Sequence, residues 1–292
     1  MAKKIKKNSF KSKKRADRIA SIFAFLVIVF FAALTILPLF WMVRSSLLED
    51  KILYLYPPKF FPREMTLENY QTLGTAFPYF KLLKNTFTLI TPAVIGGTLT
   101  AILSGYAFAR LRFKGKKFIF SLCIASMLVP YVVTMIPLYV MFVKYMGLGH
   151  GSYLPLIIPY FCGGGMFNIF LIRQFMLTIP KELDEAAMID GASRMRTLWS
   201  ILVPSISSAI IVVALLLFVT NWNDVLGPMI YLSASKDKWP FAIALNTFKG
   251  SFGIEWGRMM AAASLSVLPG VLIYLICQRY FIEGIVMTGM KN

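Results

Sequence analysis

Residues 19–43 read IASIFAFLVIVFFAALTILPLFWMV, a long stretch that contains no charged side chain. A transmembrane helix needs roughly 20 predominantly apolar residues. The stretch is too long for the apolar core of a signal peptide, and no A-x-A cleavage pattern follows it. We therefore expect an uncleaved first membrane span.

The composition of the whole chain agrees with a membrane protein. Hydrophobic residues make up 58% of the 292 residues and charged residues 15%, and the mean hydropathy is +0.68. A soluble domain would expose more charge. Further apolar runs lie at about residues 86–109, 118–142, 153–176, 203–225 and 259–282. The sequence predicts an all-α polytopic membrane protein with six transmembrane helices.

The formal net charge of +18 could indicate nucleic-acid binding, but the basic residues lie between the apolar runs, where they set topology. The 31 Lys and Arg residues divide 20 to 11 in favour of the side that holds the N-terminal tail. We therefore predict that both termini are cytoplasmic. Residues 1–18 would form a basic cytoplasmic tail, disordered and lying on anionic lipid, before a transmembrane domain over residues 19–292. No nucleic-acid partner is expected.

Two external segments are long, residues 44–83 and 227–258. Within the second, Phe241–Phe248 is apolar but too short to span. It could be an exposed loop that touches a partner, which we favour, or a re-entrant segment packed in protein. Spans three and four are interrupted by Pro130, Pro137, Pro155, Pro159 and Gly163–Gly165. Such interruptions mark either a pathway or a packing kink.

Catalytic and metal-binding signals are weak in this sequence. His150 is the only histidine, in a Gly-rich turn, and the three cysteines show no ligand spacing. The phosphate-binding pattern G-x-x-x-x-G-K-[ST] is absent. We expect no catalytic residue, no metal site and no cofactor bound by this chain, which argues against a membrane enzyme. An ion-driven secondary solute transporter remains the alternative, although such proteins normally carry mid-span ionisable residues.

The stretch EAAMIDGAS, Glu185–Ser193, is a polar interruption between the fourth and fifth apolar runs. The spacing predicts one amphipathic helix over residues 182–200. One expected stripe is apolar and one is small and polar; they comprise Met188, Ala192, Met195, Trp199 and Leu202, and Ala186, Asp190, Ser193 and Thr197. The helix could lie on the membrane surface or dock into a groove of a partner. Its polar face has small residues rather than Lys or Arg, which favours docking.

The spacing of this segment resembles the cytoplasmic motif of ABC importer permeases, in which EAA, three residues, G and nine residues precede I-x-L-P. Here Glu185-Ala186-Ala187 and Gly191 precede Ile201-Leu202-Val203-Pro204, with Val203 in place of leucine. LENYQTL, GYAFARLRFKGKK, TNWNDVLGP and the C-terminal QRYFIEG also resemble maltose-type sugar permeases, most of all the second, smaller subunit of the pair. The final MKN departs from the usual VKG.

The resemblance implies a heterodimer with a second permease subunit, two ATPase subunits that bind ATP and magnesium, and an external solute-binding protein. It implies an import path for a carbohydrate, expected to be an oligosaccharide, across the plasma (inner) membrane of a bacterium or archaeon. Import would proceed by alternating access coupled to closure of the ATPases. Contact with the ATPase would involve Glu185, Ala186, Ala187, Asp190 and Gly191. Contact with the binding protein would involve Phe248, Lys249, Gly250, Ser251 and Phe252.

Asn221, Asn223 and Asp224 lie near the outer end of the fifth apolar run. They are either ordinary interface residues, since Trp222 beside them suits an aromatic belt, or groups that line the path of the sugar and hydrogen-bond its hydroxyls.

Overall fold

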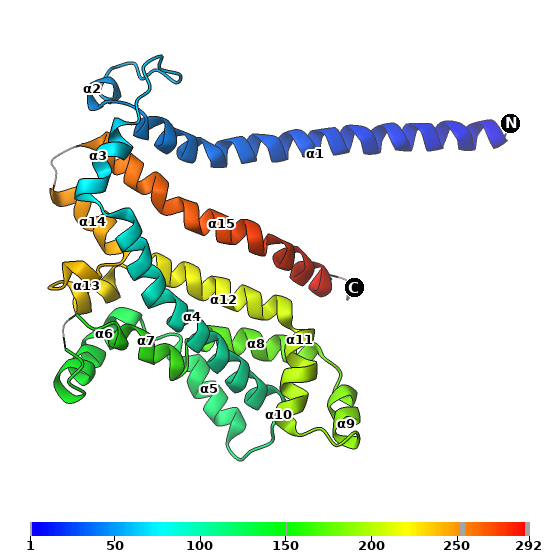
Figure 1. The fold of residues 1–292 in the computed structure, drawn as a ribbon. Helices are drawn as coiled ribbons and strands as arrows, with labels where there is room; N and C mark the ends of the chain where they lie inside the picture. The colour runs from blue at the N-terminus through cyan, green and yellow to red at the C-terminus, as the bar shows by residue number, and fades with distance from the viewer. Residues whose placement is uncertain (1, 150, 252–254, 290–292) are drawn as a thin grey trace. The chain divides into compact units, whose positions relative to one another are not determined.

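The computed structural model describes residues 2–149, 151–251 and 255–289, with side chains described except at residues 2–16, 75–76, 248–251 and 280–289. Within these ranges every regular element is helical (Figure 1), which confirms the all-α prediction. His150 and Phe252 lie outside the described residues. The chain forms two compact units, Met1–Leu73 with Ile254–Leu265 and Gly74–Gly253 with Ser266–Asn292.

In the part of the chain that the structure describes, four helices are long and apolar enough to cross a membrane, over Asp17–Ser46, Tyr79–Arg110, Leu154–Thr178 and Trp256–Arg279. Two bent helix pairs raise this number to six if each pair forms one span. The pairs are Lys116–Ser126 with Tyr131–Tyr145, bent by 99°, and Arg194–Ser205 with Ser207–Trp222, bent by 82°. The six predicted runs thus all correspond to helices, but the third and fifth are sharply bent.

The first unit contains helix α1 (Ala2–Ser46) and the short helix α2 (Asp50–Leu53), and it shares α3 (Glu68–Ala76) and α15 (Trp256–Gly289) with the second unit. Because α1 begins at Ala2, the expected disorder is wrong for residues 2–18. Lys, Arg and Ala are good helix formers, so the helix of the first span can continue into this region. The apolar part of α1 is exposed, as expected for a helix whose surroundings are lipid.

Asn69 fixes the turn that follows α1. Its side-chain amide donates hydrogen bonds to the carbonyls of Ser46 at 3.0 Å and Leu48 at 2.8 Å. A Cβ atom at Gly257 would lie 2.6 Å from the same Asn69 amide nitrogen. The Gly257 N–H donates to Asp50 Oδ1 at 2.9 Å, so α15 begins where only a glycine fits.

The second unit contains the remaining helices, several of which pack against α4 (Tyr79–Arg110). Their bounds are α5 (Lys116–Ser126), α6 (Tyr131–Val140), the π-helical turn η1 (Met141–Tyr145), α7 (Leu154–Phe161), α8 (Met166–Thr178), α9 (Glu182–Ile189), α10 (Arg194–Thr197), the π-helical turn η2 (Leu198–Leu202), α11 (Val203–Ser205), α12 (Ser207–Trp222), α13 (Leu226–Leu232), the 3-10 turn η3 (Lys236–Lys238) and α14 (Phe241–Ser251).

Small residues on α4 let its neighbours approach closely. A Cβ at Gly97 would lie 2.8 Å from Leu217 of α12, and a Cβ at Gly105 would lie 2.8 Å from Ile172 of α8. Interfaces between transmembrane helices are enriched in such residues because they permit close backbone packing. Figure 1 shows α4 running beside α8 and across α12.

The predicted interruptions differ in their effect. Pro137 and Pro159 lie inside α6 and α7 without ending them, whereas α6 begins directly after Pro130. The three glycines Gly163–Gly165 separate α7 from α8, each with positive φ. A Cβ at Gly164 would lie 2.8 Å from the Gly97 Cα atom, so the break lies against the backbone of α4.

The two ends of α4 contact different parts of the second unit. Near its start, the Asn85 amide donates to the Asp237 and Trp239 carbonyls, and the Thr86 hydroxyl accepts from the Phe241 N–H. At its last residue, Arg110 pairs with Asp184 of α9. A helix of this length extends about 48 Å, enough to cross the membrane. Accordingly α13 and α14 lie at one end of the unit and α9 and α10 at the other (Figure 1).

Phe241 and Ile243 of α14 are buried, and the Phe241 ring packs on Phe77 and Trp222. The favoured expectation of an exposed partner-binding loop at Phe241–Phe248 is therefore wrong for these side chains. An aromatic cluster can bury this apolar segment within the protein, so the packed alternative holds for its first turn.

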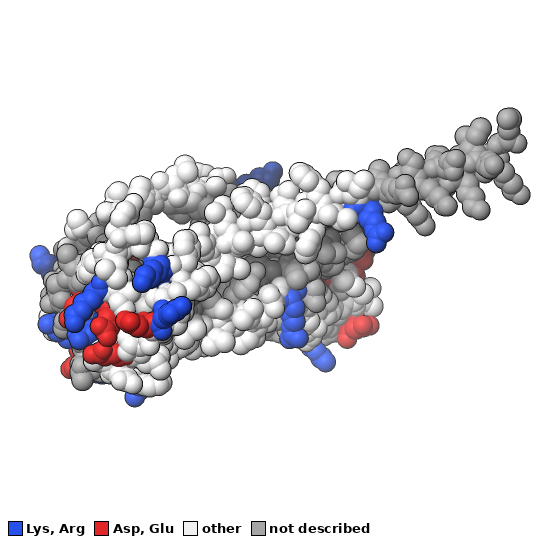
Figure 2. Space-filling model, turned by 90° about the horizontal axis from the view of Figure 1, so that it is seen from above, with Lys and Arg blue, Asp and Glu red and all other residues white. Residues whose placement is uncertain are grey.

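Figure 2 shows the charged side chains gathered in separate patches, and most of the described surface drawn there carries no charge. This distribution is expected for a protein whose middle is surrounded by lipid.

Candidate functional site

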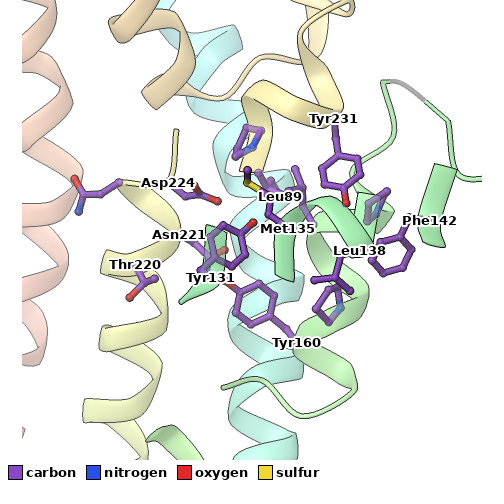
Figure 3. A pocket seen from close by; sticks show the side chains of 15 residues that line it. Leu89, Tyr131, Met135, Leu138, Phe142, Tyr160, Thr220, Asn221, Asp224 and Tyr231 are labelled. Carbon is purple, nitrogen blue, oxygen red and sulfur yellow. The ribbon is translucent and has the colours of Figure 1, made fainter. Parts of the chain in front are cut away.

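A cavity of about 390 Å³ lies between α4, α6, α7, α12 and α13. Its lining is largely apolar, with polar groups concentrated along the turn that joins α12 to α13 (Figure 3). The lining residues are Leu89, Tyr131, Met135, Leu138, Phe142, Pro155, Leu156, Pro159, Tyr160, Thr220, Asn221, Asn223, Asp224, Pro228 and Tyr231.

Asn221, Asn223 and Asp224, the residues predicted to line a sugar path, all contribute to this cavity. The side-chain amides of Asn221 and Asn223 each donate to a carbonyl one turn earlier, at 2.8 Å. Asp224 Oδ1 accepts from the Gly227 N–H at 3.1 Å. These bonds hold the three side chains at the end of α12, where their oxygen atoms can accept hydrogen bonds from a ligand.

Tyrosines form the opposite side of the same cavity. Figure 3 shows the rings of Tyr131 and Tyr160 near Asn221 and Asp224, and Tyr231 packs against Phe142 at a ring distance of 6.5 Å. The sequence analysis missed these tyrosines. Tyr131 and Tyr160 each directly follow a proline within an apolar run, Pro130 and Pro159, and that pairing was the available signal.

The cavity thus combines aromatic faces with amide and carboxylate oxygens. Pockets of this kind use apolar walls for affinity and a few polar groups for orientation. Its lining contains no Lys or Arg among the described residues, so it suits a ligand rich in hydroxyl groups better than an anion.

The EAA segment lies at the other end of the second unit. Glu185, Ala186, Asp190 and Gly191 are exposed, whereas Ala187 is buried. The predicted single helix over residues 182–200 is wrong, because α9 ends at Ile189 and α10 begins at Arg194.

Gly191 explains this break, since it has a φ of +79°, a conformation that favours glycine at helix ends. The Ala192 N–H then donates to the Ala187 carbonyl at 2.9 Å. Ser193 begins the next helix by accepting a hydrogen bond from the Arg196 N–H at 3.3 Å.

The break also disrupts the two predicted stripes. Met188, Met195 and Trp199 of the expected apolar stripe are exposed. Leu202 of the same stripe is fully buried as expected, together with Leu198, in the core with α8 and α12. Thr197 of the expected polar stripe is buried as well. The reversal of the chain at Gly191 turns α10 relative to α9, so one periodicity cannot describe both.

An ion pair attaches α9 to α4. Arg110 Nε lies 2.7 Å from Asp184 Oδ2, and the two side chains are 6% and 16% exposed. Arg110 also donates to the Ile179 carbonyl at 2.8 Å. Burial raises the pKa of Asp184 above its ordinary value, and the Arg110 guanidinium offsets part of that rise. No local sequence signal linked these two residues, which are far apart in the chain.

The segment predicted to meet a binding protein is the end of a helix rather than a loop. Residues Phe248, Lys249, Gly250 and Ser251 belong to the last part of α14, and Phe252 lies outside the described residues. Among the described residues, no group of three His, Cys, Asp or Glu side chains could hold a metal ion.

Comparison with known proteins gives consistent results. Residues 97–286 match the family described as "Binding-protein-dependent transport system inner membrane component". The chain is 32% identical to the osmoprotective compounds uptake permease protein GgtD of Synechocystis sp., over 71% of this chain and 69% of that protein. It is 29% identical to the trehalose/maltose transport system permease protein MalG of Thermococcus litoralis, over 95% and 99%.

A solved structure shows the same fold. It is a chain of a bacterial ABC transporter involved in the import of the acidic polysaccharide alginate, with a TM-score of 0.78 and 21% identity, over 91% of this chain and 98% of that chain. The family match confirms the resemblance seen in the sequence and argues against an ion-driven secondary transporter. The protein is therefore a member of the binding-protein-dependent transport system inner membrane component family, the permeases of ABC importers.

Proposed function

We propose that this chain forms half of the translocation pathway of an ATP-driven importer for a carbohydrate, with a second permease subunit forming the other half. The cavity with Tyr131, Tyr160, Asn221, Asn223 and Asp224 supports this proposal most directly. Tyrosine faces can pack on the apolar faces of sugar rings, and amide and carboxylate oxygens accept hydrogen bonds from sugar hydroxyls.

The names of relatives agree with a carbohydrate. Besides the trehalose/maltose permease, the arabinooligosaccharides transport system permease protein AraQ of Halalkalibacterium halodurans is 27% identical over 96% of this chain and all of that protein. We infer an oligosaccharide as the substrate of this chain. The solved alginate transporter takes an acidic polysaccharide, whereas the cavity described above has a carboxylate and no basic residue in its described lining. This difference favours an uncharged sugar.

The exposed part of α9 is the proposed contact with two ATPase subunits, which would bind ATP and magnesium. Glu185, Ala186, Asp190 and Gly191 are available to a partner, and buried Ala187 faces the permease. α9 is tied to α4 by the Arg110–Asp184 pair, and α4 also reaches the cavity through Leu89. Movement of α9 on closure of the ATPases could thus shift the helices that line the cavity.

Such a movement would exchange inward-open and outward-open states of the two permease bundles. ATP would shift their populations through its different affinity for the two states. α9 and both termini would then lie in the cytoplasm, consistent with the distribution of basic residues.

The end of α14, including residues 248–251, is the proposed contact with an external solute-binding protein. It belongs to the end of the second unit opposite to α9 (Figure 1). A bacterial alginate ABC transporter has been solved in complex with its alginate pentasaccharide-bound periplasmic protein, a precedent for such a contact in this fold.

The test is to purify the tagged chain from its host and reconstitute the recovered assembly with the binding protein in liposomes. We expect a second permease and an ATPase to copurify, and uptake of neutral oligosaccharides to require ATP. Glu185→Lys should release the ATPase or uncouple hydrolysis from uptake. Glu182→Lys is the matched control, since Glu182 is exposed on the same helix but lies outside the EAA segment.

Recovery of the chain without an ATPase, or uptake driven by an ion gradient in the absence of ATP, would contradict the proposal. Equal effects of Glu182→Lys and Glu185→Lys would remove the assigned role of the EAA residues while leaving carbohydrate import intact.

A further inference from the structure

A second cavity, of about 500 Å³, lies at the end of α4 away from the sugar cavity. It is bordered by the last turn of α4, the loop that leads to α5, and parts of α9 and α10. The candidate span of α4 ends at Arg110 and the next one begins at Lys116, and both residues line the cavity. The cavity therefore lies at the level where two apolar helices leave the membrane.

The lining of this cavity is strongly basic. Its five basic side chains are Arg110, Arg112, Lys116, Lys181 and Arg194. Only two carboxylates, Asp184 and Glu185, accompany them. The cavity thus has a surplus of three positive charges.

Most of these basic side chains take part in no described ion pair. Arg110 is paired with Asp184, and Lys116 Nζ donates to the Leu111 carbonyl at 2.9 Å. Among the described side chains, Arg112, Lys181 and Arg194 take part in no ion pair. These three side chains are exposed, and like charges gathered around one cavity give it a positive potential that attracts an anion.

The walls of the cavity strengthen this argument. Tyr106 and Thr197, which also line it, are 8% and 3% exposed. A cleft that is lined by one sign of charge and has low-dielectric walls focuses its field on an approaching counter-ion. Arginine and lysine together are the usual ligands of phosphate, arginine through its planar fork and lysine as a point charge.

We propose that this cavity binds the phosphate group of an anionic ligand, with Arg112, Lys181 and Arg194 as its ligands. Because the cavity lies at the ends of two spans, the favoured source of the phosphate group is the headgroup of an anionic phospholipid. Basic pockets between transmembrane helices on the cytoplasmic side bind such headgroups. A soluble phosphate has the same chemistry and is distinguished by experiment. A ligand here would lie directly beside Glu185 of the EAA segment.

The test uses the full-length chain purified in mild detergent together with its bound subunits. Native mass spectrometry measures binding of added phosphatidylglycerol, with phosphatidylcholine and inorganic phosphate as the other two probes. The variant is Arg112→Gln with Lys181→Gln. The matched control is Lys114→Gln, in the same loop as Arg112, with Arg196→Gln in α10; it removes the same charge from exposed residues outside the cavity lining.

We expect the wild-type chain and the control to bind phosphatidylglycerol in preference to phosphatidylcholine. Each basic residue near a membrane strengthens binding of anionic lipid about fivefold, so the variant should bind about 30-fold more weakly. If inorganic phosphate alone binds, and the variant alone loses it, the site is supported with a soluble ligand.

Equal weakening in the variant and the control would show general attraction to positive charge, and the inference would be wrong. It would also be wrong if the variant lost its ATPase partner while its binding of lipid and phosphate stayed unchanged, because the basic residues would then serve a protein contact. Both variants change residues outside the described ion pairs, so the chain should still fold.

Discussion

The buried Arg110–Asp184 pair predicts a specific pattern of stability in three variants, Arg110→Met, Asp184→Leu and the double variant. At 2.7 Å and an effective dielectric constant of about 20, the attraction is about 6 kcal/mol. Burial costs a similar amount, because removing two charges from water requires several kcal/mol per ion. The pair should therefore add little net stability, whereas either ion alone should be strongly destabilising, by about 3–5 kcal/mol.

The two single variants should respond differently to pH. In Arg110→Met, Asp184 can escape its buried charge by taking up a proton. Because the ordinary pKa of this carboxyl group is 3.8, its protonation costs about 4 kcal/mol at pH 7. The cost falls by about 1.4 kcal/mol for each unit that the pH is lowered. The folded pKa of Asp184 is raised above its unfolded value, so stability is lost as pH rises between the two values. Arg110 cannot deprotonate, so Asp184→Leu should show no such recovery.

The assay is reversible unfolding of the purified protein in mixed detergent micelles between pH 5.5 and 8. We expect Arg110→Met to recover stability at pH 5.5, Asp184→Leu to stay destabilised, and the double variant to be more stable than either single variant. Arg196→Met, at an exposed arginine of α10, is the control and should change stability by less than about 0.5 kcal/mol. The reasoning is refuted if both single variants cost less than about 1 kcal/mol, or if the double variant is as unstable as the worse of them.

Two glycines and one tyrosine provide further tests. Gly164→Ala should lower the stability of the folded protein by about 2–4 kcal/mol, because φ is +46° and the new Cβ would lie 2.8 Å from the backbone of α4. The measurement is size-exclusion chromatography, in which the variant should lose its monodisperse peak. Gly191 has a φ of +79°, but no atom lies within 4 Å of a Cβ added there. Gly191→Ala should therefore cost only about 1–2 kcal/mol of stability, and the assembly should persist. An equal loss of stability in Gly164→Ala and Gly191→Ala would argue against the steric explanation. Tyr131→Ala should raise the KM for sugar uptake by roughly 3- to 10-fold through lost ring contact, whereas Tyr145→Ala, an exposed tyrosine outside the cavity lining, should leave uptake unchanged.

Several features of the site could be predicted from the sequence because they depend on local pattern. The run Leu154–Thr178 was expected within two residues of its observed bounds, since apolar length alone identifies a span. The EAA spacing identified the family, which the match over residues 97–286 confirms. Asn221, Asn223 and Asp224 were chosen as polar groups at the end of a span, and they do line a cavity; their role in transport stays a prediction.

Other features could not be read from periodicity. The continuous helix over residues 182–200 was wrong because Gly191 reverses the chain, and the pattern of apolar residues is the same whether or not the helix is broken. The burial of Phe241 and Ile243 depends on a pocket of aromatic side chains from α4 and α12, which are distant in sequence. For the same reason Tyr131 and Tyr160 were missed, since each is an ordinary aromatic residue until the fold brings them together.

The sequence by itself determined that this is a membrane protein, that its fold is helical and which family it belongs to. Hydrocarbon permits only structures that satisfy their own backbone hydrogen bonds, so a long apolar run such as Ile19–Val43 has one solution. Only the tertiary structure decided which polar groups meet. The approach of α9 to α4 creates the Arg110–Asp184 pair and the basic cavity beside it. Gly97 and Gly105 of α4 in turn let α12 and α8 pack closely against that helix. Close packing brings together residues that are distant in the sequence because their shapes are complementary, and no local periodicity of the sequence encodes that complementarity.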